Sequence, residues 1–310
     1  NLLMVASLFY TKDNKIKLKK GDEVIVPAVS WSTSYYPLYQ YGLKIKFVDI
    51  DLDTLNYDLK KLKTAVTDKT KVILAVNLLG NPNDFKEIKK IINKKDIVLI
   101  EDNCESLGAE FENKKTGTIG LLGTFSFFFS HHISTMEGGM IVTDNEELYH
   151  ILLSLRAHGW TRNLPEDNLI AKKSKNSFDE SFRFVLPGYN LRPLEMSGAI
   201  GSIQIQKFPK FLIQRKKNAE KFIDEMKKYN DIITQKEIGS SSWFGFSMVI
   251  KPDSKRTRAD LVKKLHEIGF ECRPIVAGNF AKNDVVKYFN YEVNDDLKNA
   301  NLVDKNGIFI

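Results

Sequence analysis

The first half of the chain alternates short aliphatic and β-branched runs with segments whose apolar residues recur three and four positions apart. The first pattern predicts buried strands, at residues 23–26, 45–50, 72–76 and 97–100. The second predicts helices between them, at residues 34–41, 59–66 and 85–92. Strands that alternate with helices form βα units, so we expect an α/β fold with a mostly parallel sheet covered on both faces.

The centre of the chain is more polar. Two further predicted strands, 124–129 and 140–143, flank a polar loop that contains the adjacent histidines 131–132. Asp144 is expected to cap the helix that follows. The segment 160–187 is polar, weakly periodic and longer than an ordinary connection, which indicates a functional loop.

The last third predicts one long helix and a small mixed unit. A helical pattern covers residues 194–229, with an interruption expected at Pro209. A strand at 243–250 and a helix at 258–268 are typical of a small α+β domain. We expect a large domain and a smaller C-terminal one, at residues 1–200 and 201–310. The chain begins without Met and stops within an apolar run, so we expect it to be a fragment.

Composition excludes several classes of protein. With 310 residues, 43% of them apolar and 27% charged, the chain can build a substantial core and is not a disordered segment. The net charge of +7 attracts phosphate-bearing partners without specifying one. The lysines cluster on predicted helices without interleaved aromatic residues, so we interpret them as solvated helix faces and expect no nucleic-acid partner.

Cysteine and hydropathy patterns narrow the picture further. Cys104 and Cys272 cannot supply a CxxC pair, a four-cysteine cluster or a disulfide framework, and we interpret them as reduced thiols of a cytoplasmic protein. The longest apolar run, residues 72–79, falls far short of the ~18 residues that span a bilayer, so no membrane partner is expected.

Polar groups follow three of the predicted strands, where open α/β sheets bind their ligands. An acidic residue at the end of a buried strand is costly without a partner, so Asp102 indicates either a cationic ligand atom or a helix cap. Trp31 is either a core aromatic or a ring-stacking platform. Adjacent histidines are poor metal ligands, and we expect no metal site; one imidazole, His131 or His132, is a natural proton shuttle.

Six blocks in this order resemble the DegT-type sugar aminotransferase family, whose members have the pyridoxal-phosphate aspartate aminotransferase fold. The resemblance extends over essentially the whole chain. The blocks are residues 21–28 (GDEVIVPA), 47–51 (FVDID), 100–103 (IEDN), 124–127 (TFSF), 137–139 (EGG) and 187–195 (PGYNLRPLE).

One departure from the family pattern carries most information. His131, six residues before Glu137, stands where aminotransferases of this family have the lysine that forms a Schiff base with the cofactor. An imidazole cannot form that bond. The resemblance therefore implies the dehydratase branch, in which pyridoxal phosphate is held non-covalently and works as pyridoxamine phosphate. Residues 155–163 (LRAHGWTRN) also resemble this branch; a sister branch with a four-cysteine iron–sulfur cluster is disfavoured.

The resemblance also implies roles for residues around the cofactor ring. Asp102 would pair with the pyridine nitrogen and keep the ring an electron sink. Glu105 would bind the ring hydroxyl, where the aminotransferases usually have Gln. Trp31 would stack on the ring, and His131 would act as acid and base.

Further implied roles concern the phosphate and the substrate. Ser126 would bind the cofactor phosphate, and Asn190 of a second subunit would reach the same group, which implies a homodimer. Arg162 would bind an anionic group of glutamate or of the nucleotide, and His158 is a further candidate for substrate binding. The role of His132 stays open.

The function that the resemblance implies is 3-dehydration of a nucleotide-linked 4-keto-6-deoxyhexose, with GDP-4-keto-6-deoxymannose favoured. L-glutamate would be the amino donor, and the product a 3,6-dideoxy-4-keto sugar for cell-surface polysaccharide such as lipopolysaccharide O-antigen. Two alternatives stay open. One is a sugar-nucleotide aminotransferase that uses another lysine, such as Lys114 or Lys115, and the other is a non-catalytic member of the family.

Overall fold

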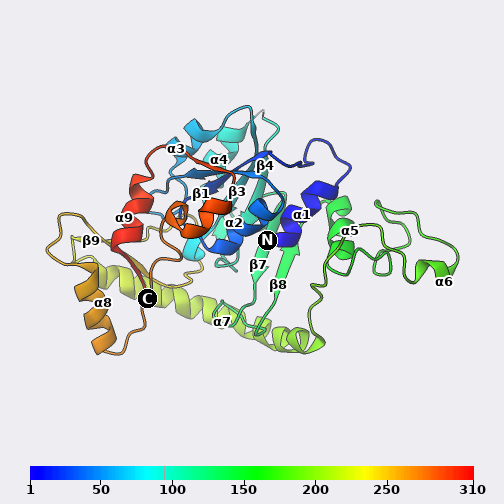
Figure 1. The fold of residues 1–310 in the computed structure, drawn as a ribbon. Helices are drawn as coiled ribbons and strands as arrows, with labels where there is room; N and C mark the ends of the chain where they lie inside the picture. Colours follow the sequence, from blue (N-terminus) through cyan, green and yellow to red (C-terminus); the bar gives the residue numbers. More distant parts are fainter. Residues whose placement is uncertain (94) are drawn as a thin grey trace.

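A seven-stranded sheet forms the centre of the computed structural model, which describes residues 1–93 and 95–310 (Figure 1). Five strands follow the predicted pattern in the spatial order β2-β1-β3-β4-β7, and all are parallel. β11 adds a parallel strand at one edge, and β8 pairs antiparallel with β7 at the other. The strands are β1 (Glu23–Pro27), β2 (Lys44–Val48), β3 (Thr70–Val76), β4 (Val98–Asp102), β7 (Leu122–Ser126), β8 (Gly139–Val142) and β11 (Tyr291–Val293). The expected α/β fold is confirmed.

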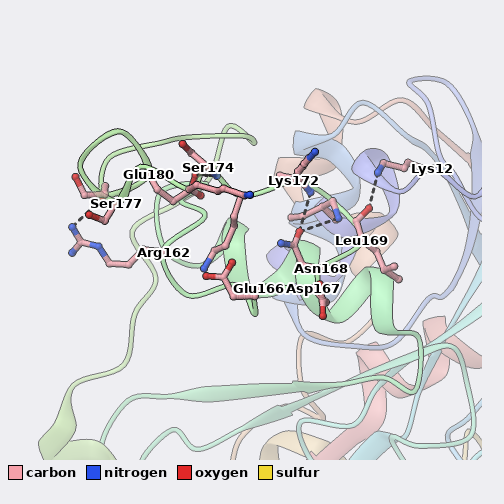
Figure 2. Close-up of a pocket in the computed structure, with 15 residues that line it drawn as sticks. Lys12, Arg162, Glu166, Asp167, Asn168, Leu169, Lys172, Ser174, Ser177 and Glu180 are labelled. Atoms are coloured by element: carbon pink, nitrogen blue, oxygen red, sulfur yellow. Dashed lines mark hydrogen bonds between the residues drawn. The ribbon is translucent and has the colours of Figure 1, made fainter.

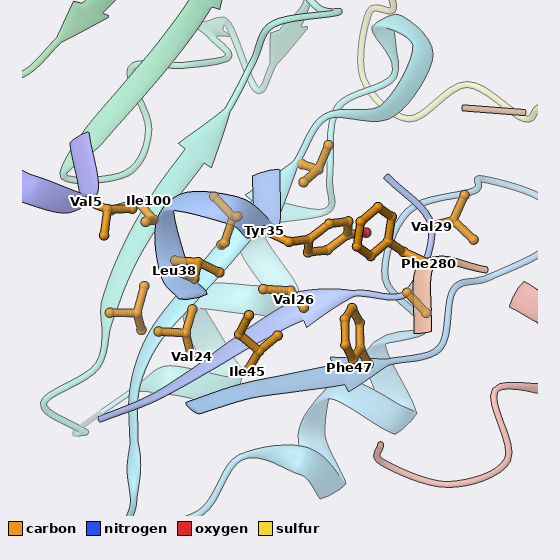
Figure 3. Packing of buried hydrophobic residues seen from close by; sticks show 14 of the residues in the cluster. Val5, Val24, Val26, Val29, Tyr35, Leu38, Ile45, Phe47, Ile100 and Phe280 are labelled. Atoms are coloured by element: carbon orange, nitrogen blue, oxygen red, sulfur yellow. The ribbon is translucent and has the colours of Figure 1, made fainter. Parts of the chain in front are cut away.

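Helices cover both faces of this sheet because its strands carry apolar side chains on both sides. Along β1, Val24 and Val26 belong to one buried cluster and Ile25 to another, as the two-residue period of a strand requires. Figure 3 shows the first cluster, where Tyr35 and Leu38 pack over β1 and β2. That face is covered by α1 (Leu2–Tyr10), α2 (Ser32–Gln40) and α5 (Glu146–Leu155), the opposite one by α3 (Leu59–Ala65) and α4 (Phe85–Ile92).

The C-terminal part forms a second, three-stranded antiparallel sheet. Its order is β12-β10-β9, with β9 (Ile232–Thr234), β10 (Ser247–Ile250) and β12 (Gly307–Phe309). Helix α8 (Arg258–Glu267) packs near it, and α9 (Lys298–Asn306) leads into β12. The predicted division at residue 200 falls within α7 (Glu195–Met226), and β11, from the C-terminal part, pairs with β2 of the large sheet. The division into two domains stays a prediction.

Three local predictions were wrong. The cap of α5 is Asn145, whose side chain accepts the Leu148 N–H, because Asp144 lies one residue too early to reach it. The helix at 195–226 continues through Pro209, since a proline removes one hydrogen bond and the turns on both sides are retained. The strand predicted from 243 begins at Ser247, because Trp243 has a φ of 49° and is not extended.

Large parts of α7 and of the loop before it face outward. Among the described residues of α7, only Ala219 is buried, and Figure 1 shows the helix running beneath the sheet while the loop with α6 (Ser177–Glu180) projects from the body. Exposed apolar side chains in this region include Phe178, Phe182, Leu191, Leu194, Met196, Ile200 and Ile203. In the described part of the chain, none of the helices is both long enough and apolar enough to cross a membrane.

Candidate active site at the carboxyl end of β4

Asp102, the last residue of β4, is buried at the carboxyl edge of the large sheet. Its Oδ2 accepts hydrogen bonds from Ser34 Oγ at 2.7 Å and from Asn1 Nδ2 at 2.6 Å. Its Oδ1 accepts the backbone N–H of Cys104 at 3.2 Å. Within residues 1–93 and 95–310, no Lys or Arg forms a salt bridge with this carboxylate, so it is fixed in place by neutral donors and can accept a further charged one.

His131 lies in the loop between β7 and β8, and its ring bonds to the backbone just beyond the end of β4. Its Nδ1 is 2.7 Å from the carbonyl oxygen of Cys104. A carbonyl only accepts, so Nδ1 carries the proton and the lone pair is left on Nε2. Burial lowers the pKa of His131 below its ordinary value, and the Cys104 carbonyl and Asp102 counteract part of that effect. The imidazole is therefore neutral at pH 7 and has one free basic nitrogen.

Glu105 lies one turn beyond Asp102, and its Oε2 accepts the backbone N–H of Leu79 at 2.9 Å. Although the residue keeps some solvent exposure, the surroundings of its carboxyl are poorly solvated. This desolvation raises the pKa of Glu105 to about 7, with a further rise from Asp102 and a decrease from Arg273. A carboxyl with this pKa can either donate or accept a proton near neutral pH.

Two more of the predicted residues lie at the same edge of the sheet. Trp31 precedes the first residue of α2, and 57% of its surface is exposed, so it is not a core aromatic and its indole face is available for stacking. Ser126 ends β7, and its Oγ accepts the N–H of Phe128 at 3.3 Å. Trp31 lies beyond the carboxyl end of β1, as the sequence predicts, whereas Ser126 is the last residue of β7 although the predicted strand 124–129 places it in the strand interior.

The predicted substrate residues Arg162 and His158, and Asn190, which is predicted to bind the cofactor phosphate, lie in another part of the chain. Arg162 is exposed, stands 4.7 Å from the ring centre of Trp160 and donates to the Ser181 carbonyl. It lines an open pocket of about 970 Å³ formed mainly by the polar 162–181 loop (Figure 2). His158 packs on Trp160, and Asn190 is exposed with its side chain accepting from Arg192. In the part of the chain described, no hydrogen bond links these three residues to His131 or Asp102, and their roles stay predictions.

The structure also brings two residues of the C-terminal part of the chain to the site. Phe244, from the segment before β10, packs against His131 with ring centres 5.0 Å apart. Arg273 lowers the pKa of both His131 and Glu105 through its positive charge. The sequence predicts that the aromatic run 243–246 is part of a strand, and its contact with the loop before β8 is therefore not predictable from the sequence.

Comparisons with known proteins identify the family of the chain. The model of the "DegT/DnrJ/EryC1/StrS aminotransferase family" matches residues 8–310. The GDP-4-keto-6-deoxy-D-mannose 3-dehydratase of Escherichia coli O55:H7 is 64% identical over 312 residues, which cover 100% of this chain and 80% of that protein.

Solved structures give the same result. A structure of the E. coli GDP-4-keto-6-deoxy-D-mannose 3-dehydratase with bound hydrated pyridoxal phosphate superposes with a TM-score of 0.97 at 64% identity, covering 100% of this chain and 79% of that one. A variant of such a dehydratase with bound GDP-perosamine has a TM-score of 0.97 at 63% identity, covering 100% and 80% of the two chains. The chain therefore belongs to the DegT/DnrJ/EryC1/StrS aminotransferase family.

Proposed function

We propose that this protein is a pyridoxal-phosphate-dependent 3-dehydratase of a GDP-linked 4-keto-6-deoxymannose, with L-glutamate as the amino donor. The observation that carries the proposal is the placement of His131. It replaces the family lysine, and its ring is fixed to the Cys104 carbonyl beside Asp102 with Nε2 free. The 64% identity to a GDP-4-keto-6-deoxy-D-mannose 3-dehydratase supports the choice of substrate.

The residues at the end of β4 fit the cofactor. Asp102, already held by Ser34 and Asn1, has the capacity to accept the N–H of a pyridinium ring, and the exposed indole of Trp31 offers a stacking face. Ser126 and, from a second subunit, Asn190 would hold the phosphate. When bound, pyridoxamine phosphate supplies an amine that condenses with a carbonyl, and a ring that accepts the electron pair released by deprotonation.

His131 would perform the proton transfers. Its Nε2 would take the proton from the cofactor carbon that carries the amine, and the resulting imidazolium would give that proton to the departing C3 hydroxyl, because hydroxide is a poor leaving group at neutral pH. The bond from Nδ1 to the Cys104 carbonyl keeps the ring oriented and becomes stronger when the ring is charged. One imidazole with one free nitrogen is sufficient for both steps.

We infer that the protein is a homodimer located in the cytoplasm. Exposed apolar residues on α7 and on the loop before it support this inference, because a second copy of the chain would bury them. They include Met196, Ile200 and Ile203. In this proposal, Asn190 of a partner subunit completes the phosphate site. The two cysteines, neither of them in a disulfide, are consistent with a reducing compartment.

Among the described residues, neither lysine of the aminotransferase alternative bonds to Asp102 or His131. Lys114 and Lys115 form the short strand β6 (Lys114–Lys115) and are exposed, with Lys115 paired to Glu110. Neither is placed to replace His131.

A product assay tests the proposal directly. The protein is supplied with pyridoxal phosphate, L-glutamate and GDP-4-keto-6-deoxymannose, and ammonia and sugar products are quantified. We expect one ammonia per 3-deoxy-4-keto sugar. A stoichiometric amino sugar, or a lysine–cofactor adduct after borohydride reduction and mass analysis, would contradict dehydration. CDP- and dTDP-linked 4-keto sugars serve as controls for the nucleotide.

A further inference from the structure

His132, the neighbour of the proposed catalytic base, is buried, and its ring bonds to a different segment of the chain from that of His131. Its Nε2 lies 3.1 Å from the carbonyl oxygen of Ser242, so Nε2 carries the proton. Its Nδ1 is buried without a hydrogen-bond partner in the described chain. A buried acceptor left without a partner lowers stability, so the hydrogen bond to Ser242 is retained despite that cost.

The next two carbonyls of the same segment are also held by a side chain. Nη1 of Arg215, on α7, donates to the carbonyls of Trp243 and Phe244 at 2.9 and 3.0 Å. Thus three consecutive carbonyls, of residues 242–244, accept hydrogen bonds from just two side chains. We call this segment the 242–244 turn.

The 242–244 turn has a conformation that needs such support. Trp243 has a φ of 49°, in the left-handed region, which is unfavourable for a bulky residue. The other side of the turn packs against Gly80, where an added Cβ would lie 2.4 Å from the Trp243 nitrogen. The backbone N–H of Phe244 donates to the Leu79 carbonyl, next to the N–H that binds Glu105.

The result of this arrangement is the placement of Phe244. Its ring contacts both histidines, at 5.0 Å from His131 and 5.8 Å from His132. We propose that His132 and Arg215 are positioning residues that hold the 242–244 turn so that Phe244 packs against His131 and keeps water from it. The inference rests on the proposed function, in which His131 is the base.

The surroundings of His132 keep its ring neutral, which suits a side chain that only holds a backbone carbonyl. Burial, together with the charge of Arg215, lowers the pKa of His132 to about 3, so His132 stays neutral and does not repel Arg215 across the working pH range. The charged groups that act on His131 itself are Asp102, which raises its pKa, and Arg273, which lowers it. Desolvation is the largest influence on His131, and Phe244 is one of the groups that desolvate it.

The test compares His132→Phe, which keeps an aromatic ring without the donor, with His132→Gln, whose amide can reach the Ser242 carbonyl. In His132→Phe we expect kcat to fall about 10- to 100-fold with little change in KM, and the acid limb of the pH profile to move to higher pH as His131 regains water. His132→Gln should have the same kcat and the same acid limb of the pH profile as wild type. Arg215→Met should reproduce the effect of His132→Phe by an independent route.

His150→Phe provides the matched control, because His150 is also buried and bonded to backbone, through the Leu169 N–H, on α5. It should lower thermal stability without moving the pH limb. A His132→Phe protein that loses only stability, with an unchanged limb and kcat per folded molecule, would overturn the inference. Failure of the wild-type protein to dehydrate would instead overturn the proposed function.

Discussion

Nδ1 of His131 and the carbonyl oxygen of Cys104 are 2.7 Å apart, which links the loop before β8 to the end of β4. This one bond determines which imidazole nitrogen is basic and directs the ring to the strand end that carries Asp102. The primary amine of a lysine at this position would be a nucleophile for the cofactor aldehyde. The imidazole is limited to proton transfer.

His131→Lys should exchange one chemistry for the other. We expect it to form a lysine–cofactor bond that borohydride traps and mass analysis locates, while C3 deoxygenation falls by about 10²–10⁴-fold, the range for loss of a general base. His131→Asn is the control, since it provides neither amine nor base and should lose both. Retained deoxygenation in His131→Lys would contradict the role of the imidazole.

Glu105→Gln should change the pH dependence of stability. The folded-state pKa of Glu105 is raised from its ordinary value of 4.5 to about 7, so the native state binds more protons between these values and loses stability as pH rises. Glutamine is free of this loss and retains an oxygen for the Leu79 N–H. In cofactor-free melts, the variant should exceed wild type by about 2–4 °C at pH 8 and match it at pH 4.5.

The corresponding change at an exposed acid, Glu267→Gln on α8, tests whether the effect is specific. The change in melting temperature between pH 4.5 and pH 8 should be the same in Glu267→Gln as in wild type. A pH-independent shift in Glu105→Gln would mean that the Glu105 carboxyl is not protonated in the folded protein near neutral pH.

Arg273→Gln should affect both binding and proton transfer. The guanidinium lies 4.8 Å from the Phe309 ring centre and lowers the pKa of His131 and Glu105. Removal of its charge should move the acid limb of the pH profile to higher pH. If it also binds an anion of the substrate or of glutamate, the KM for that compound alone should rise about tenfold.

Arg256→Gln is the matched control, because Arg256 pairs with Asp231 near α8 and does not influence His131. Its pH profile should equal that of wild type. An unchanged limb in Arg273→Gln would show that the charge of Arg273 is screened from His131 in solution.

The apolar face of α7 should prove to be an interface between two copies. Paired substitution of Ile200→Asp and Ile203→Asp places charges among exposed apolar residues and should convert a dimer to a monomer in sedimentation experiments. Cofactor retention should fall in parallel if Asn190 acts across the interface. Ile268→Asp, at an exposed site next to α8, should leave the assembly unchanged.

Much of the large sheet could be predicted from local pattern. The helix expected at 85–92 has those bounds in the structure, and β1 begins at the predicted Glu23. These segments were recognisable because strands buried on both faces are continuously apolar, and because amphipathic helices repeat every three to four residues. Asp102 was recognisable for the same reason, as an acid that directly follows such a strand.

Contacts between distant segments were not predictable in this way. Ser242 bonds to His132, and Arg215 bonds to the 242–244 turn from α7; the left-handed Trp243 turn itself has the composition of a strand. Neither the apolar periodicity nor the residue propensities of a segment indicate which carbonyl a side chain bonds to when that carbonyl lies more than a hundred residues away. Such contacts depend on how the whole chain packs.

By itself, the sequence determined the layered α/β architecture and the replacement of the family lysine by His131, because both are properties of neighbouring residues and of residue identity. The tertiary structure alone decided which nitrogen of each histidine is protonated, since that depends on carbonyls brought by Cys104 and Ser242. It also decided that burial, rather than a counter-ion, is the main influence on the pKa of His131 and Glu105, because desolvation exists only in the packed chain.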